Sequence, residues 1–484
     1  MCQRIDDTER ESKGEAEMEH DGQLCMTEGP IGRELLQLAL PVLLSQLLQQ
    51  FYNIADASII GQAAGAVGLA AVGSAGLLLS VMVNFFIGLS TGVSVVAAQM
   101  FGAGQYERLK ACIHTAVAAA LAFGVVFQAA GLAGTDRLLF WLGTPQDAME
   151  PCRRYLRICF WGMAPQLVYN VGTAILRALG NTRSPLYYLT FCSALNIGLD
   201  YLFVVVWHLD VQGAAAATLL SQFLSAVLVW GRLKRLSPAF RLRFSGVRMH
   251  GAQLKLLAAA GIPAGLQAVF MSISSLVIQT SINSFGTAAM AGMTVFSKAE
   301  GFLYFPLFSL GIAVTSFAGQ NAGAGQFERI RTGMRISVWV GLGLWAVFAA
   351  LLLAAEPLVL AIFTTDQAVL ENAQTAIRYI FPFYCLYAVN QVYIGVLRGM
   401  GHTFSPMAVT ILCYCAFRIV WCSLLLPLRH DMRVIYLSYI LSWVIMIVLL
   451  AVCCRRSLEK EEAALTPSPL SSSSDKAPYP GHSD

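Results

Sequence analysis

Two aspartates stand in stretches of sequence that otherwise have the composition of membrane helices. Asp56 lies near the end of LLQLALPVLLSQLLQQFYNIADASIIG, and Asp200 lies within ALNIGLDYLFVVVW. Asn196 precedes Asp200 by four residues, so the two side chains point from the same face of a helix. A carboxylate and an amide oxygen placed together can bind a hard cation or take part in a proton network. Because charged side chains are costly inside a membrane, these residues are candidates for function.

The composition defines the class of protein that must position them. Hydrophobic residues make up 57% of the 484 residues and charged residues 12%, against roughly 25% charged residues in soluble domains. The chain is therefore predicted to be an integral membrane protein. Its net charge of +4 is small and its basic residues fall in short loops, which argues against nucleic acid as a partner. The twelve cysteines show no paired metal-ligand spacing and are interpreted as structural.

The apolar segments predict an all-α fold with twelve transmembrane helices, each needing about 20 residues to cross the hydrocarbon. Residues 1–30 are polar and lack the pattern of a signal peptide, and residues 456–484 are rich in Ser and Pro, so we expect a cytoplasmic tail at each end, the second disordered. The twelve predicted segments are 34–58, 68–98, 109–134, 153–179, 186–207, 211–232, 254–284, 289–318, 332–363, 373–399, 406–427 and 433–454.

The basic residues of the loops predict the orientation. Lys and Arg cluster after the even-numbered segments, most strongly in RLKRLSPAFRLRFSGVR, and are nearly absent after segments 1, 5, 7 and 11. The positive-inside rule then places both termini and the linker 233–253 in the cytoplasm of a multi-pass protein of the cell (inner) membrane. Arg137, Arg153 and Arg154 are an exception on the outer side. The linker has no apolar run of its own, so we expect it to tolerate substitution.

The chain is an internal duplication. QMFGAGQYER at 99–108 returns as QNAGAGQFER at 320–329, and LRALGNTRSP at 176–185 returns as LRGMGHTFSP at 397–406, both at an offset of 221 residues. Six helices per half give two parallel repeats, predicted as a lobe of residues 31–232 and a lobe of residues 254–455 around a central cleft. The glycine-rich loops are interpreted as plain turns without a ligand.

The depth of the two aspartates follows from this topology. Asp200 lies 15 residues past Pro185, which is about 22 Å along a helix that starts at the cytoplasmic face. Asp56 lies 22 residues past Glu34, so both carboxylates fall in the outer half of the membrane and can meet. The alternative for Asp56 is a helix end at the lipid headgroups, whereas Asp200 is followed by YLFVVVW and stays inside its apolar span.

Several motifs together resemble the multidrug and toxic compound extrusion (MATE) family of cation-coupled efflux transporters. They are FYNIADASIIG, GLSTGVSVVAAQMFGAG, LRALGNTRSPLYYLTFCSALNIGLDYLF and GQNAGAGQFER, and the likeness covers about residues 30–455. It is strongest to the damage-inducible-protein-like branch of bacteria and archaea. The resemblance implies a coupling site for H⁺ or Na⁺ at Asp56, Asn196, Asp200 and Thr218. It also implies a cavity position at Asn170, where an interhelical hydrogen bond is the alternative, and a bending position at Pro41, where ordinary proline tolerance is the alternative.

The second lobe has its own charges but has lost the first lobe's acids. Lys298, Glu300 and Arg418 are placed to face its interior, either as a structural ion pair or with a role toward the substrate or in gating. Adding 221 carries Asn196 to Phe417 and Asp200 to Trp421. Asp56 falls on Val277, or on Ile278 with the offset of 222 that aligns Pro41 with Pro263. Coupling is therefore predicted in the first lobe only.

The predicted function is secondary active efflux of amphipathic, cationic organic compounds by antiport with H⁺ or Na⁺. The glycine-rich loops lack the Lys and Ser/Thr of a phosphate-binding loop, so we expect no enzyme activity and no cofactor besides the coupling ion. The expected partners are small-molecule substrates and the lipid bilayer, with the chain acting as a monomer. A lipid-linked sugar flippase of the same superfamily would be expected to have cationic residues in its cavity, and a channel or receptor would need no coupled acids.

Overall fold

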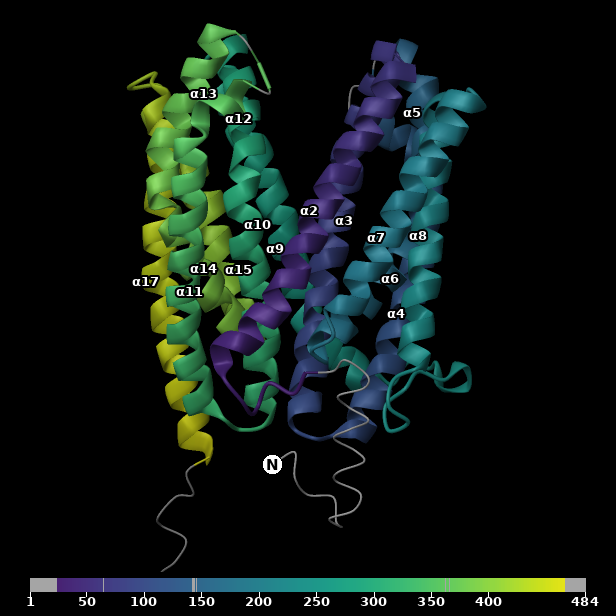
Figure 1. Cartoon of the computed structure of the whole chain (residues 1–484), viewed down its shortest axis with the longest axis vertical. Coiled ribbons are helices and arrows are strands. Elements are labelled where there is room, and N and C mark those ends of the chain that lie inside the picture. The colour runs from purple at the N-terminus through teal and green to yellow at the C-terminus, as the bar shows by residue number, and fades with distance from the viewer. Residues whose placement is uncertain are drawn as a thin grey trace, which may run out of the picture.

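The computed structural model describes residues 24–465 apart from residues 64, 142, 143, 145, 362 and 365, and the regular elements in this part of the chain are all helical (Figure 1). The first half contains α2 (Ile31–Ala63), α3 (Gly65–Gly102), α4 (Tyr106–Trp141), α5 (Gln146–Trp161), α6 (Met163–Ala178), α7 (Arg183–Asp200), the π-helix η1 (Tyr201–Val206) and α8 (Asp210–Lys234). A short 3-10 turn, η2 (Phe244–Gly246), lies in the linker. The second half contains α9 (Gly251–Asn283), α10 (Thr287–Gly323), α11 (Phe327–Ala354), α12 (Glu356–Ala361), α13 (Gln367–Ile380), η3 (Phe381–Phe383), α14 (Tyr384–Gly399), α15 (Phe404–Thr410), the π-helix η4 (Ile411–Phe417), α16 (Arg418–Leu425) and α17 (Met432–Leu465).

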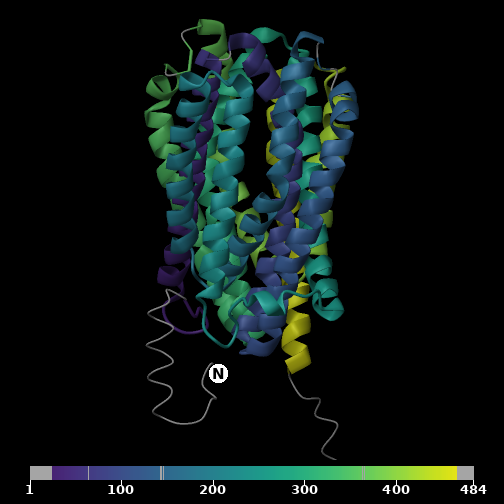
Figure 2. The same ribbon diagram turned by 90° about the vertical axis from the view of Figure 1, so that its right-hand side faces the viewer.

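The helices form two bundles that meet at one end and diverge toward the other (Figure 1). Helix α2 begins and α17 ends where the bundles meet, which we call the proximal end, and the opposite end is the distal end. Seen from the side, the helices run along the long axis of the molecule (Figure 2). The bundles touch along α3 and α9, where a methyl group at Gly92 would overlap the backbone of Gly261. Small residues therefore allow the close approach of the two lobes.

The first helix of each half packs its proximal end into the core of the other half. Leu35 and Leu38 at the start of α2 are fully buried in the core of the second lobe, next to Phe317. Leu257 and Ala260 at the start of α9 are buried in the core of the first lobe. An offset of 222 carries Leu35 to Leu257 and Leu38 to Ala260, so the exchange is reciprocal. The predicted lobe boundaries at residues 31 and 254 stay a prediction, and the proximal end of each helix packs in the core of the opposite half.

Within the described part of the chain, eleven helical spans are long and apolar enough to cross a membrane. The predicted segment that is not among these eleven, 153–179, corresponds to the pair α5 and α6, which is broken at Gly162. Pro165 lies in the first turn of α6 and cannot donate a hydrogen bond back to Trp161, which explains the break. The two halves of this pair together supply the missing span.

Two expectations for the polar segments need correction. Helix α17 continues to Leu465, although a disordered tail was predicted from residue 456, and Glu462 in this extension pairs with Arg331 of α11 at 3.0 Å. The linker 233–253 is not uniformly tolerant, since Phe240 is 2% exposed and its ring lies 5.7 Å from that of Tyr106. The tail predictions for residues 1–23 and 466–484 lie outside the described residues.

Candidate ion-coupling site

The carboxyl groups of Asp56 on α2 and Asp200 at the end of α7 are hydrogen-bonded to each other. Asp200 is fully buried and Asp56 is half-buried. An ionised carboxylate can only accept hydrogen bonds, so two carboxyl groups form such a bond only when one of them carries a proton. The structure therefore brings the two predicted acids to one depth and arranges them as a pair able to hold a proton.

Asn196 and Thr218 complete the predicted set on α7 and α8. With its amide nitrogen turned toward the acids, Asn196 donates to Oδ2 of Asp200 at 2.9 Å and accepts from the backbone N–H of Thr218 at 3.2 Å. The Thr218 side chain lies near the hydroxyl of Tyr52, one turn before Asp56 on α2. Among the described residues, Oδ1 of each aspartate is buried without a hydrogen-bond partner.

Three neighbours of the acid pair were missed in the sequence. Tyr52 is four residues before Asp56 and on the same helical face, a spacing that could have indicated it. Tyr155 and Cys159 of α5 lie near each other and within electrostatic range of Asp56. Nothing in the local sequence of α5 shows that this face points at α2, because that depends on the packing of two distant helices.

A π-helical turn directly follows Asp200. Helix η1 begins at Tyr201, and the N–H of Trp207 donates to the carbonyl of Leu202 at 2.9 Å, which is an i to i+5 bond. Turns of this kind occur often at functional sites. One inserted residue rotates the following side chains by about 100°, so the apolar YLFVVVW does not continue the face of Asn196 and Asp200.

The corresponding positions of the second lobe are packed hydrophobic side chains. Ile278 is 2% exposed, and the rings of Phe417 and Trp421 lie 5.6 Å apart. These aromatic side chains stand where the first lobe has Asn196 and Asp200. The second copy keeps the helices and has no carboxyl pair at these positions.

Glu300 on α10 is the acid that the sequence analysis placed toward the interior of the second lobe. Its Oε1 accepts a hydrogen bond from the hydroxyl of Tyr384 at 2.8 Å. In the part of the chain that the structure describes, neither Lys298 nor Arg418 forms an ion pair with Glu300 within 4.0 Å. Lys298 is exposed. The direct structural ion pair considered from the sequence is therefore not formed.

Arg418 on α16 is buried among aromatic rings. Its guanidinium lies 4.1 Å from the ring centroids of both Tyr414 and Tyr439, and its Nε donates to Ser442 at 2.9 Å. Arg418 is 5% exposed and lies within electrostatic range of Glu300. The second lobe therefore balances a buried cation by cation–π contacts and by a carboxylate at longer range.

The two remaining predicted positions make local contacts. The side chain of Asn170 donates to the carbonyl of Gln166 on its own helix at 3.0 Å. Among the described residues, it forms no hydrogen bond to another helix. Pro41 lies inside the continuous helix α2, and the Ser45 hydroxyl donates to the Pro41 carbonyl at 2.8 Å. This structure contains one conformation of α2, and a bending role for Pro41 stays a prediction.

A sequence model of the MatE family matches the chain twice, over residues 41–202 and 263–424. The chain belongs to this family, and the double match confirms the duplication. It is 28% identical to "Probable multidrug resistance protein YoeA" of Bacillus subtilis over 79% of this chain and 84% of that protein. It is 27% identical to "FAD transporter" of Shewanella oneidensis over 83% of this chain and 88% of that protein.

Solved structures confirm the fold. A structure described as "Outward-facing conformation of a multidrug resistance MATE family transporter of the MOP superfamily" has a TM-score of 0.85 at 21% identity, covering 90% of this chain and 98% of that one. A MOP superfamily transporter from Pyrococcus furiosus has a TM-score of 0.82 at 22% identity, covering 90% and 97%. The chain is thus a multi-pass membrane transporter with the twelve-helix MATE fold, and not an enzyme.

Proposed function

We propose that the protein is a secondary active multidrug efflux transporter that exports amphipathic, cationic organic compounds by antiport with H⁺ or Na⁺. The observation that carries this proposal is the hydrogen-bonded pair of Asp56 and Asp200, buried in one lobe of a MATE fold. Several relatives are named as probable multidrug resistance proteins, which supports the choice of cargo.

The orientation is part of the proposal. Most basic residues lie in or next to helix ends such as the start of α4, the end of α8 and the start of α11, and these ends lie at the proximal end, where α2 begins. The positive-inside rule then puts the proximal end in the cytoplasm. The exceptional Arg153 lies at the other end and is ion-paired with Asp136 and Glu150, each at 2.7 Å. In this orientation the lobes diverge toward the outside.

Competition for the carboxyl pair supplies the coupling. When the shared proton leaves, two negative charges remain at hydrogen-bond distance, which is unfavourable unless another cation binds. A cationic cargo from the cytoplasmic side can supply that charge, and so can Na⁺ bound by the carboxyl oxygens. A proton or Na⁺ from outside then neutralises the acids and displaces the cargo outward. Because one pair binds both ligands, the two fluxes run in opposite directions.

The second lobe offers the cargo a different environment. Glu300 lies among aromatic side chains, with the rings of Tyr384 and Tyr387 5.2 Å apart. Aromatic faces beside a carboxylate suit an organic cation of no fixed shape. We therefore assign Glu300 and Arg418 to the range and rate of cargo binding, and the coupling ion to the first lobe.

Dye efflux from proteoliposomes under separately imposed pH and Na⁺ gradients tests the proposal. We expect one of the two gradients to drive a cationic dye against its concentration and the other to have little effect. Dye movement that only follows its own concentration gradient would instead indicate a channel. Movement of a lipid-linked sugar without any transport of the dye would indicate a flippase.

A further inference from the structure

The duplicated glycine-rich motif also joins the two lobes. Gly104 and Gly325 have φ values of +66° and +72°, so the turns themselves form as predicted. The side chain of the first glutamine in each motif, however, forms a hydrogen bond with the other lobe. Gln99 donates to the carbonyl of Gly399 at 2.8 Å, and Gln320 donates to the carbonyl of Ala178 at 2.8 Å. The offset of 221 carries Gln99 to Gln320 and Ala178 to Gly399, so the two bonds are the same contact made in both directions.

Each of these bonds gives a partner to a carbonyl group at the end of a helix in the opposite lobe. Ala178 ends α6 and Gly399 ends α14, and the last carbonyl groups of a helix have no partner within it. The backbones also touch reciprocally, since a methyl group at Gly102 would overlap the carbonyl oxygen of Gln320, and one at Gly323 would overlap that of Gln99. The contact therefore depends on the relative position of the lobes.

The segment Leu24–Pro30, which we call the strap, crosses the same contact. Met26 is fully buried, its N–H donates to Oε1 of Gln320 at 2.8 Å, and its carbonyl accepts from Asn321 at 3.0 Å. Arg329 donates to the carbonyl of Gly29 at 2.9 Å. These bonds attach the strap to the second lobe. Leu24 at its other end lies against Gly180 of the first lobe.

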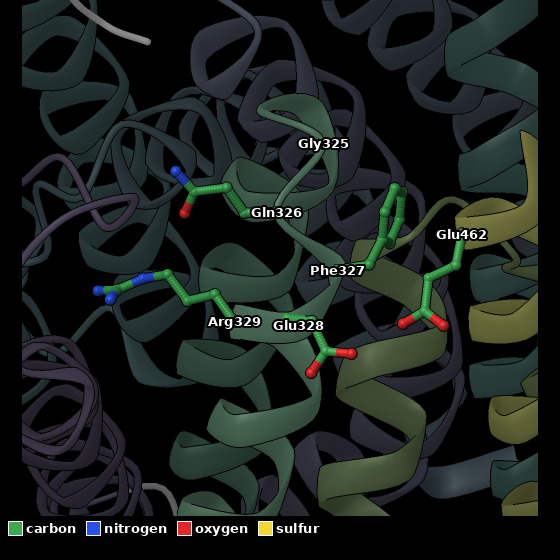
Figure 3. Close-up of a pocket in the computed structure, with 6 residues that line it drawn as sticks. All are labelled: Gly325, Gln326, Phe327, Glu328, Arg329 and Glu462. Atoms are coloured by element: carbon green, nitrogen blue, oxygen red, sulfur yellow. The ribbon is translucent and has the colours of Figure 1, made fainter. Parts of the chain in front are cut away.

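The surroundings of this contact are open to water. Phe327, Glu328, Arg329 and Glu462 are among the residues that line a hollow of about 380 Å³. Figure 3 shows the side chain of Arg329 extending away from those of Phe327 and Glu462. Arg329 instead forms an ion pair with Glu34 at 3.1 Å. A second hollow of about 370 Å³ reaches Gln99. Gln320 is fully buried, so water can replace the partners of these amide and carbonyl groups once the lobes separate.

We propose that Gln99, Gln320 and the strap form the proximal gate of the transporter, closing this end in the present conformation and separating when the lobes rock. This inference rests on the proposed alternating access of the transport cycle. Rotation of one lobe breaks both glutamine bonds together, because each joins a side chain of one lobe to the backbone of the other. The strap moves with the second lobe and leaves Gly180.

The distance between two spin labels tests the gate without any transported compound. Glu107 and Glu328 are equivalent in the two repeats, with side chains 86% and 80% exposed at the proximal end. In a background without native cysteines, labels at these two sites are compared between the wild type and Gln99→Ala/Gln320→Ala. We expect a longer-distance population to increase by about 2- to 10-fold for each lost hydrogen bond. An unchanged distance distribution would refute the proposed gate, and this result would not depend on which compound the protein transports.

The second glutamine of each motif provides a matched control. Gln105 precedes α4, and its one described side-chain bond is the one that its amide oxygen accepts from Arg108 at 3.1 Å. Gln326 precedes α11 in the same repeat position. Gln105→Ala/Gln326→Ala should leave the distances as in the wild type, and an equal shift there would contradict the specific role of Gln99 and Gln320.

A cross-link across the gate gives a functional measurement that does not depend on those variants. A side chain at Gly319 would have its Cβ 2.8 Å from that of Ala98, so Ala98→Cys/Gly319→Cys can form a disulfide after a small shift. Oxidation should stop transport and reduction should restore it. Wild-type transport by the cross-linked protein would show that this end need not open.

Discussion

Replacing Asp200 with Asn separates the protonation of the site from its folding. The Asn oxygen can accept the bond that Asn196 now donates to Oδ2 at 2.9 Å, and its NH₂ group can donate to Asp56. Both hydrogen bonds are retained, so we expect the free energy of unfolding to change by less than about 1 kcal/mol. The amide cannot bind or release a proton. Gradient-driven efflux should therefore fall to the rate measured without a gradient.

Asp200→Ala is the matched comparison. It leaves the amide of Asn196 and the carboxyl group of Asp56 without their partner in a buried site, at a cost of about 1 to 3 kcal/mol for each group. We expect a total loss of about 2 to 6 kcal/mol, visible as a lower midpoint of thermal unfolding in detergent. Dye efflux in vesicles, at matched protein levels, then compares coupling in the two variants.

Two results would refute this reasoning. Wild-type efflux by a folded Asp200→Asn protein under an imposed gradient would remove Asp200 from coupling. A loss of stability in Asp200→Asn as large as that in Asp200→Ala would mean that the hydrogen bonds to Asn196 and Asp56 do not hold the site together.

Three further predictions concern the two lobes and the linker. Asp56→Asn should abolish cation-dependent efflux, and Asp56→Asn/Asp200→Asn should be no worse than either single variant, because the pair acts as one unit; additive losses in a vesicle assay would argue against a single site. Glu300→Gln should change the range or rate of exported dyes and keep the gradient dependence, whereas uncoupled efflux in this variant would move the site to the second lobe. Phe240→Ala should lower the free energy of unfolding by about 3 to 5 kcal/mol, and Phe244→Ala, at a ring that is 68% exposed, by less than about 1 kcal/mol; equal unfolding midpoints would contradict the buried position of Phe240.

The sequence was sufficient for the fold and for the central pair of acids. Twelve apolar segments and two repeated motifs define two parallel halves, which the double family match confirms. Counting residues from Pro185 and Glu34 put Asp200 and Asp56 at one depth because a helix rises by a fixed amount per residue. That estimate requires no knowledge of which helices are neighbours.

The features that the sequence did not predict all depend on contacts between distant segments. The start of α2 has the same apolar pattern whichever lobe it packs against, so the exchange of α2 and α9 is invisible locally. The glutamines of the repeated motif look like turn residues until Gly399 and Ala178 are placed opposite them. Phe240 is one aromatic residue in a basic linker, and only the position of Tyr106 shows that it is buried.

The most direct test of antiport measures cation movement caused by the cargo itself. In proteoliposomes with no imposed gradient, adding a cationic dye on one side should drive H⁺ or Na⁺ toward that side, against the direction of dye movement, and Asp200→Asn should abolish this cation flux. Dye transport that moves no H⁺ or Na⁺ in the wild type, or a cation flux that persists unchanged in Asp200→Asn, would contradict coupling at the pair of Asp56 and Asp200.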